Sequence, residues 1–391
     1  MREIPLELLG LHGSDPFYGN THSARGAMYA SQVGQVPVVS GSEPPRILTG
    51  IELRFGEHTF DVKFPKDATV LHVLRKYPRG YGDDSIKHNP VVTIIYEDYY
   101  DEFKTIGAIV VPEFTSLHQE FGFELKKNES VFNTLTAGSM FAKDTVIASS
   151  TTVDENGLYG IGVNANVLFR SSPGTIEDGF VFCKEFLEEQ MIPTTYTQAV
   201  GGCGRRSFFL NMYGDADRYQ PFPDIGQRVR DDGVVFAVRD IDDLLAPAEM
   251  TSRSLREFDR TFDRGVIAEP GSIVKDINVY WDERQNPTHV PLGMETQLRK
   301  YYDALKKYHS EIISINRGLL GRRKDKLRCT PEFQQLVVEA MTFLPQDLKK
   351  RKLSRMYRLE QLDEWRVEIT YATERIPSNA AKMSDCFGGV H

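Results

Sequence analysis

The residues of this chain best suited to chemistry are two adjacent carboxylates, Glu177 and Asp178. They follow a break in the apolar pattern at residues 171–174 and directly precede an apolar run that begins at residue 179. A carboxylate that opens an otherwise buried strand is costly unless a cation or an arginine pairs with it. Because neighbours on a strand face opposite sides, only one of the two acids can point into a given site. This segment is the first candidate for a functional site.

Two cations and an amide elsewhere in the chain could complete such a site, namely Arg25, Gln35 and Lys382. Arginine holds a phosphate through two parallel hydrogen bonds, and lysine acts as a point charge. With the two carboxylates, these groups have the chemistry to handle a nucleoside triphosphate and its metal ion. Their spacing alone does not show whether they converge, and each one taken alone is more often part of an ordinary ion pair.

Other short motifs favour structural interpretations. Asp215 and Asp217 have the acidic spacing of some magnesium sites, but their surroundings have loop composition, which predicts a solvated turn. The glycines at 160–162 and 201–204 match neither the P-loop nor the dinucleotide fingerprint, and we expect strand turns there. The four cysteines are scattered without CxxC spacing, which predicts reduced thiols.

Composition is that of an ordinary globular protein of 391 residues, 40% hydrophobic, which predicts two or three lobes. No apolar run approaches the ~20 residues that span a bilayer, and the acidic start argues against a signal peptide, so we expect no membrane and a cytoplasmic location. The net charge of −8 argues against a free-standing nucleic-acid binder. Basic stretches at 316–328 and 349–358 suit either contact with nucleic acid on one face or solvated helix faces.

The elements that must position these residues follow from hydrophobic periodicity. A helix is expected over residues 24–33, capped by Thr21 or Ser23. Further helices are expected at 293–317 and 331–343, and a polar helical pattern at 247–264. Strands are expected at 58–64, 91–96, 105–111, 274–281 and 365–373, with turns at 154–157 and 231–233, the second a hairpin. The mixed order predicts an α+β fold rather than a Rossmann or barrel enzyme.

Six segments, in the same order, resemble the second-largest (β-type) subunit of multisubunit DNA-directed RNA polymerases. They are SARGAMYASQVGQVP at 23–37, EPPRILTGIE at 43–52, FAKDTVIA at 141–148, NGLYGIGVNANVLF at 156–169, TIEDGFVFCKE at 175–185 and RIPSNAAKM at 375–383. Each segment alone is weak, whereas six in register are specific. Between about residues 187 and 370 the similarity is loose.

The resemblance implies a role for each candidate residue. Arg25 matches an arginine near the phosphates of the incoming nucleotide, and Gln35 matches a glutamine beside the RNA–DNA hybrid. Glu177 and Asp178 match the acidic pair near the second magnesium ion and the triphosphate. Lys382 matches the first of two lysines at the RNA 3′ region. The catalytic magnesium of the family is held mainly by three aspartates on the other large subunit.

The resemblance also implies a multi-lobed fold with a mixed sheet or barrel-like core and a helical, flap-like insertion. The expected parts are an N-terminal segment at 1–55, a β-rich lobe at 56–145, a β-rich active-site core at 146–220, a flap-like region with a long helix at 221–330 and a return to the core at 331–391. The implied partners are the other polymerase subunits, template DNA, the RNA transcript and nucleoside triphosphates.

Departures from the family pattern limit these expectations. The family arginine before Gln35 is Gly34 here, and the second lysine has no counterpart. The chain therefore resembles a fragment of a β-type subunit, similar to the split subunits of giant tailed phages, inactive alone and located in the host cytoplasm or packaged in the virion. The alternatives are a non-catalytic assembly or nucleic-acid-binding scaffold and, more remotely, a stand-alone nucleotidyltransferase that uses Asp215 and Asp217.

Overall fold

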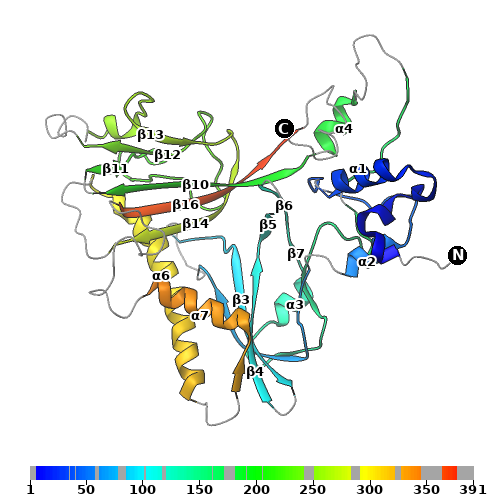
Figure 1. Ribbon diagram of the computed structural model, residues 1–391. Coiled ribbons are helices and arrows are strands. Elements are labelled where there is room, and N and C mark those ends of the chain that lie inside the picture. The colour runs from blue at the N-terminus through cyan, green and yellow to red at the C-terminus, as the bar shows by residue number, and fades with distance from the viewer. Residues whose placement is uncertain are drawn as a thin grey trace.

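The computed structural model of the chain combines helices with four β-sheets (Figure 1). It describes residues 6–34, 36–39, 41–57, 61–77, 85–100, 103–116, 120–160, 162–170, 181–190, 192–204, 206–241, 251–282, 291–321, 327–344 and 363–376. Paired strands are antiparallel, apart from one parallel pair. The prediction of an α+β fold is confirmed.

A five-stranded sheet at the centre of the molecule has the order β14-β16-β10-β6-β5. Its strands are β5 (Phe114–Ser116), β6 (Phe121–Glu124), β10 (Thr194–Gly204), β14 (Ile273–Trp281) and β16 (Asp363–Glu374). The long strands β10 and β16 pair from Thr194 opposite Glu374 to Gly204 opposite Asp363. This sheet takes strands from four of the five ranges predicted as lobes, and those boundaries stay a prediction.

A second sheet, β11-β12-β13, packs against the first through a shared core. Its strands are β11 (Ser207–Phe209), β12 (Val234–Asp240) and β13 (Arg264–Ile267). Phe236 of β12 and Trp365 of β16 are both fully buried in this core. The expected turn at 231–233 exists, since the Gly233 amide donates to the Arg230 carbonyl. It is not a hairpin, because the residues on its two sides pair with different segments.

A third sheet, β15-β4-β3-β2-β8, is covered on both faces. Its strands are β2 (Ala68–Arg75), β3 (Val91–Tyr100), β4 (Phe103–Pro112), β8 (Met140–Phe141) and β15 (Leu327–Cys329). On β3, Ile94 faces a core with Phe64, whereas Ile95 faces a core with Ile312 and Phe333. Burial on both faces explains why the strands predicted at 91–96 and 105–111 are continuous apolar runs.

A small fourth sheet, β1-β9-β7, lies beside the third and shares its core. Its strands are β1 (Val62–Lys63), β7 (Lys126–Lys127) and β9 (Val146–Ser149). The strand predicted at 58–64 is thus observed as two residues, and residues 58–60 lie outside the described ranges. Next to this sheet lies the short helix α3 (Glu129–Thr134).

Two helices join the cores, α6 (Met294–Gly321) and α7 (Pro331–Phe343). The first half of α6 contributes Tyr301 to the core of the central sheet, and its second half contributes Ile312 to the core of the third. The prediction for α7 is confirmed at both ends. At its N-terminus, the Thr330 side chain caps the helix by accepting from the Phe333 amide. The prediction for α6 ended four residues early, at Arg317.

The N-terminal part of the chain lies on the right of Figure 1 as a group of short helices. They are η1 (Leu6–Ser14), η2 (Tyr18–Asn20), α1 (Ser23–Val33) and α2 (Ile51–Glu57), and α4 (Lys184–Glu189) lies above them. Helix α1 has no buried residue. It was predicted correctly apart from its cap, because the His22 ring, rather than Thr21 or Ser23, accepts from the Ala24 amide.

Two further expectations need correction. The polar helix predicted at 247–264 is, in the described residues from 251 on, a single turn, η4 (Ser254–Arg256), followed by the start of β13. The strand expected after the two acids is absent from residues 181–183, which lead irregularly into α4. None of the described helices is long and apolar enough to cross a membrane.

Candidate functional site

Only one of the predicted site residues lies in the described part of the chain. Arg25 is exposed on α1, and its guanidinium group has no hydrogen bond or ion pair with another described residue. The other four, Gln35, Glu177, Asp178 and Lys382, fall outside the described residues. Described segments lead toward each of these four positions along the chain.

Three such segments meet at Pro193, the residue before β10. Val39 forms an antiparallel β-bridge with Pro193. From the other side, the Arg375 amide donates to the Pro193 carbonyl at 3.0 Å, just after β16 ends. These contacts bring together the segment after α1, the segment after α4 and the end of β16, which are far apart in the sequence.

The meeting point is close in sequence to the four positions outside the described ranges. Val39 follows Gln35 by four residues, and Arg375 precedes Lys382 by seven. Pro193 follows the two acids by fifteen residues, including α4. The tertiary structure thus brings together Val39, Pro193 and Arg375, three described residues that lie near the predicted positions only in the sequence.

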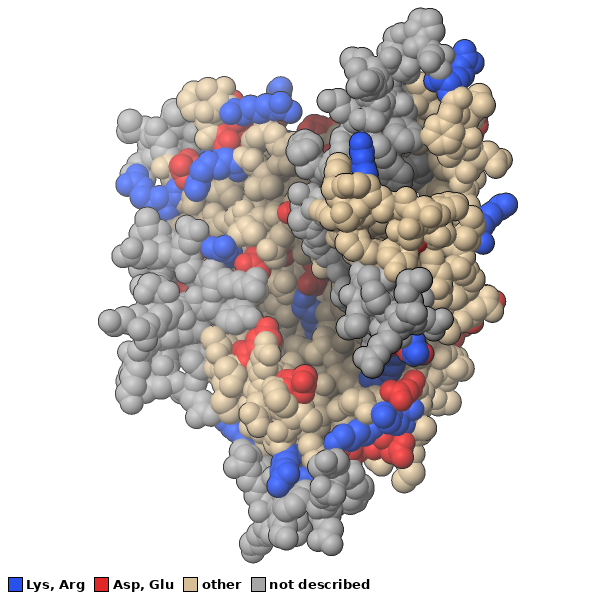
Figure 2. All heavy atoms as spheres, turned by 45° about the vertical axis from the view of Figure 1, so that its right-hand side comes forward, with Lys and Arg blue, Asp and Glu red and all other residues tan. Residues whose placement is uncertain are grey.

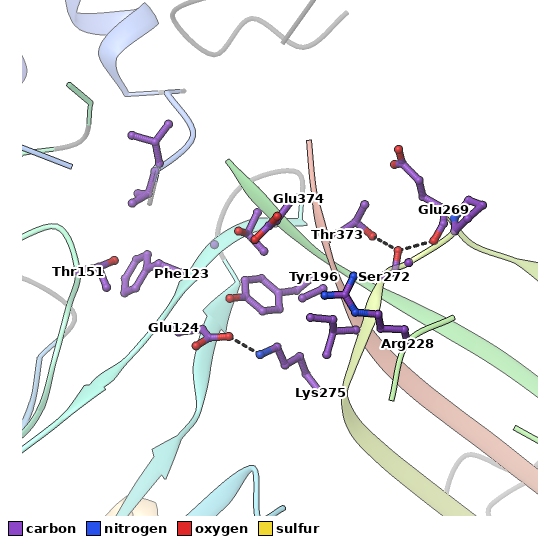
Figure 3. Close-up of a pocket in the computed structure, with 18 residues that line it drawn as sticks. Phe123, Glu124, Thr151, Tyr196, Arg228, Glu269, Ser272, Lys275, Thr373 and Glu374 are labelled. Atoms are coloured by element: carbon purple, nitrogen blue, oxygen red, sulfur yellow. Dashed lines mark hydrogen bonds and ion pairs between the residues drawn. The ribbon is translucent and has the colours of Figure 1, made fainter. Parts of the chain in front are cut away.

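A cleft of about 560 Å³ opens beside this meeting point (Figure 3). Its walls come from residues 38–39, β6, the start of β10, the end of β16 and the loop before β14. The residues that line it are Val38, Val39, Gly122, Phe123, Glu124, Thr151, Thr194, Tyr196, Arg228, Glu269, Pro270, Gly271, Ser272, Ile273, Lys275, Ala372, Thr373 and Glu374. None of these residues was predicted from the sequence as a site residue.

Two cationic side chains line the cleft, and they differ in whether a described carboxylate pairs with them. Lys275 on β14 forms ion pairs with Glu124 on β6 and, at 3.8 Å, with Glu113. Arg228 is exposed, and its guanidinium group lies toward Tyr196 without a hydrogen bond or ion pair to any described residue (Figure 3). Arg228 is thus the cation of the cleft that remains available to bind an anionic group.

Tyr196 forms the buried floor between these charges. Its ring stacks on Phe114, with ring centroids 4.3 Å apart. Burial and the nearby carboxylates of Glu124 and Glu113 raise the pKa of the Tyr196 hydroxyl well above its usual range. The hydroxyl therefore stays neutral at physiological pH and can donate a hydrogen bond, so these cleft residues suit binding rather than proton transfer.

The Asp215–Asp217 motif is a solvated turn, as predicted. Both side chains are exposed, and the Asp215 carboxylate accepts from the amides of Asp217 at 2.8 Å and Arg218 at 2.7 Å. These hydrogen bonds lower the pKa of Asp215. The carboxylate of Asp215 is thus engaged in its own turn, which is the usual role of an aspartate at such a position.

The two glycine motifs have packing roles. Gly201 lies inside β10 rather than in a turn, so that prediction was wrong, and a Cβ at Gly201 would lie 2.3 Å from Phe236. A Cβ at Gly160 would lie 2.2 Å from the Glu43 carbonyl oxygen. In both places glycine allows a close approach between segments distant in sequence.

No group of three or more His, Cys, Asp and Glu side chains in the described ranges is placed to hold a metal ion. The acidic pair expected near the second magnesium ion lies outside those ranges, so the magnesium site stays a prediction. No disulfide joins Cys183, Cys203 or Cys329 to another described cysteine, in agreement with the prediction of reduced thiols, and Cys386 lies outside the described residues.

The basic stretches are only partly described. Arg317 near the end of α6 and Arg328 on β15 are exposed, whereas residues 349–358 lie outside the described ranges. Figure 2 shows one face of the molecule, hollowed along its middle, with basic and acidic side chains interspersed. On this face the described side chains therefore do not gather into a surface of one sign, as a nucleic-acid binder acting alone would require.

Comparison with known proteins adds no relative. No protein-family model matches the chain, and no curated protein matches it. The likeness to polymerase β-type subunits therefore depends on the six short segments alone.

Proposed function

We propose that this chain is part of the β-type subunit of a multisubunit DNA-directed RNA polymerase, active only in complex with the other large-subunit chains. It would form one wall of a two-metal nucleotidyl-transfer site and contact the nucleotide and the RNA–DNA hybrid. Template DNA, RNA and nucleoside triphosphates are its ligands in this role. The metal-binding aspartates would come from another chain.

The meeting of three segments at Pro193 is the observation that carries this proposal. The resemblance assigns nucleotide-contacting roles to residues on segments that are distant in sequence. In the fold, Val39 and Arg375 both contact Pro193, and in the sequence they lie four residues from Gln35 and seven residues from Lys382. A chance likeness of short motifs would not require their flanking segments to adjoin.

In this role the chain supplies charge stabilisation and positioning. Arg25, exposed and unpaired among the described residues, would bind triphosphate oxygens through two hydrogen bonds. Lys382 would place a positive charge near the RNA 3′ end, whose hydroxyl attacks the α-phosphate and releases pyrophosphate. Bound magnesium would neutralise charge on the transferring phosphoryl group. Groups fixed before the reaction stabilise developing charge without reorganising.

Reconstitution tests the proposal. The chain is purified alone and with its co-encoded partner polypeptides, and RNA synthesis is measured on a primed template. We expect synthesis only in the assembly. Loss of one preorganised charge costs about 10²–10³ in rate, so the double variant Lys382→Ala/Glu177→Ala should lose at least about 100-fold. Asp217→Ala, a change in an exposed turn, is the matched control and should retain full activity.

Arg25→Ala serves as a third arm of the same experiment. Because Arg25 is exposed and unpaired among the described residues, its removal should leave stability within about 0.5 kcal/mol while raising the KM for nucleoside triphosphates. RNA synthesis by the isolated chain, or full activity of the Lys382→Ala/Glu177→Ala assembly, would contradict the proposal.

The second candidate is a non-catalytic scaffold derived from such a subunit, and one observation favours it. Gly34, which replaces a family arginine, ends α1, and a Cβ there would lie 3.3 Å from both the Ala30 carbonyl oxygen and Leu11 Cδ1. A side chain at this position would have to displace its neighbours. An assembly that forms with template and RNA but remains inactive would favour the scaffold.

A further inference from the structure

An exposed apolar segment stands out among the described residues. Residues 162–170 rise along the right of Figure 1, beyond α1, and residues 163–170 have neither helix nor strand structure. Val167, Leu168 and Phe169 are 62%, 79% and 92% exposed. Three consecutive apolar side chains this exposed are unusual in a soluble protein and typically mark an interaction site.

Beyond Asn164, the backbone of this segment has no hydrogen-bond partner among the described residues. Asn164 anchors its start, donating through its side chain to the Glu43 carboxylate and the Pro44 carbonyl. From Ala165 to Arg170, no residue forms a hydrogen bond with another described residue. Backbone amides and carbonyls are obligatory hydrogen-bonding groups, and a row of unpaired ones is a ready template for strand pairing.

The side chains alternate as they do in a half-buried strand. In an extended conformation Val163, Ala165, Val167 and Phe169 share one face, and every one of them is apolar. The other face carries Asn164, Asn166, Leu168 and Arg170, which are polar apart from the leucine. This period of two predicts a strand with one face on a core and the other toward solvent.

We infer that residues 163–170 add as a strand to the open sheet edge of a different polypeptide, with Val167 and Phe169 facing the core of that partner. In this mode of recognition, main-chain hydrogen bonds provide affinity and alternate side chains provide specificity. The inference rests on the proposed function only in that it takes the partner from the co-encoded polymerase chains.

A second copy of this chain fits the segment poorly. The edge strands of the described sheets have two to four residues, except β14. The first half of the outer side of β14 is already occupied, because Val274 exchanges hydrogen bonds with residues 226–227 and the Ile277 carbonyl accepts from the Tyr77 hydroxyl. Two copies of the segment alone would form a two-stranded ribbon with an uncovered apolar face, which is marginal in water.

Hydrogen exchange tests the inference. The full chain is compared alone and in a stoichiometric complex with its co-encoded chains. In the free chain, amides 165–170 should exchange at the rate of an unstructured peptide. In the complex, at about 100 times its Kd, the same amides should exchange roughly 100-fold more slowly. Amides that stay fast in a stoichiometric complex, or slow exchange in a self-associated chain without partners, would overturn the inference.

A matched pair of variants tests which face of the strand formed by residues 163–170 packs on the partner. Val167→Ser/Phe169→Ser removes the inward apolar groups and should weaken the complex by roughly 100-fold or more. Leu168→Ser removes a comparably exposed apolar group from the opposite face and should change the Kd by less than about threefold. Equal effects of the two variants would contradict strand addition.

The outcomes separate this inference from the proposed function. Protection of residues 165–170 in a complex that makes no RNA would keep the strand addition and remove the polymerase role. RNA synthesis by an assembly in which these amides exchange rapidly would support the polymerase role and rule out the strand addition.

Discussion

At the scale of single residues, the glycine-rich motif of β10 is explained by packing. A Cβ added at Gly201 would meet the Phe236 ring at 2.3 Å, inside the core between the central sheet and β12. The ring is fully buried and has little room to move, because protein interiors are close-packed. The motif therefore holds two sheets together, and no ligand is needed to account for it.

Gly201→Ala should accordingly lower the free energy of unfolding by about 1–3 kcal/mol, the usual effect of overpacking a core. Urea denaturation at neutral pH measures the change. Gly162→Ala is the matched control, because a Cβ there meets nothing within 4 Å. Similar stabilities of the two variants would show that the contact with Phe236 is not the constraint.

At the scale of elements, helix α6 carries a buried histidine, His309, whose charged form is disfavoured because the ring is shielded from water. His309 is buried, its ring centroid lies 4.5 Å from that of Phe343, and its Nδ1 has no hydrogen-bond partner among the described residues. Burial, with a smaller contribution from the positive charge of Lys76, lowers the pKa of His309 to about 4. The folded protein thus keeps this ring neutral where an unfolded chain would protonate it.

The stability of the fold should therefore depend on pH through His309. Between pH 6.5 and about 4 the unfolded state binds the extra proton, so stability falls as the pH is lowered through this window. From pH 7.5 to 4.5 we expect His309 to contribute a loss of about 2–3 kcal/mol. Urea denaturation at both pH values should show a smaller loss for His309→Gln. An equal loss in both proteins would mean that other groups carry the dependence.

At the scale of the whole molecule, one ion pair joins two sheets. Lys76, directly after β2, contacts both carboxylate oxygens of Asp276 on β14 at 2.6 and 2.7 Å. Lys76 is buried, and the Asp276 side chain is only 16% exposed. Beside them the Tyr77 hydroxyl donates to the Ile277 carbonyl. These contacts tie the third sheet to the central sheet independently of α6.

Breaking this pair from one side should be costly, because it leaves a largely buried charge without its partner. Lys76→Ala should lower the free energy of unfolding by about 3 kcal/mol. The double variant Lys76→Ala/Asp276→Ala should lose less than the sum of the two single variants. A double-mutant cycle by urea denaturation measures the difference, and additivity within about 0.5 kcal/mol would contradict a coupled pair.

Elements with a clear apolar period could be predicted from the sequence alone. Helices α6 and α7 and the strands β3, β4, β14 and β16 were all anticipated, because a repeat of three to four or of two residues records which face is buried. Where the pattern is polar, as at 247–264, periodicity was a poor guide, and a single turn precedes a strand there. Of the predicted site, only Arg25 could be compared with the described structure.

By itself, the sequence determined the α+β class and the main helices and strands, since each depends on residue type and local period. The set of residues for handling a triphosphate stays a prediction. Only the tertiary structure decided that Val39, Pro193 and Arg375 adjoin. Within the described residues, it also left the Arg228 guanidinium group without an ion pair in the cleft beside them and placed no strand next to the alternating run after Asn164. The physical reason is that contacts between distant segments are set by how sheets and helices pack, and a local pattern of side chains does not encode its partner.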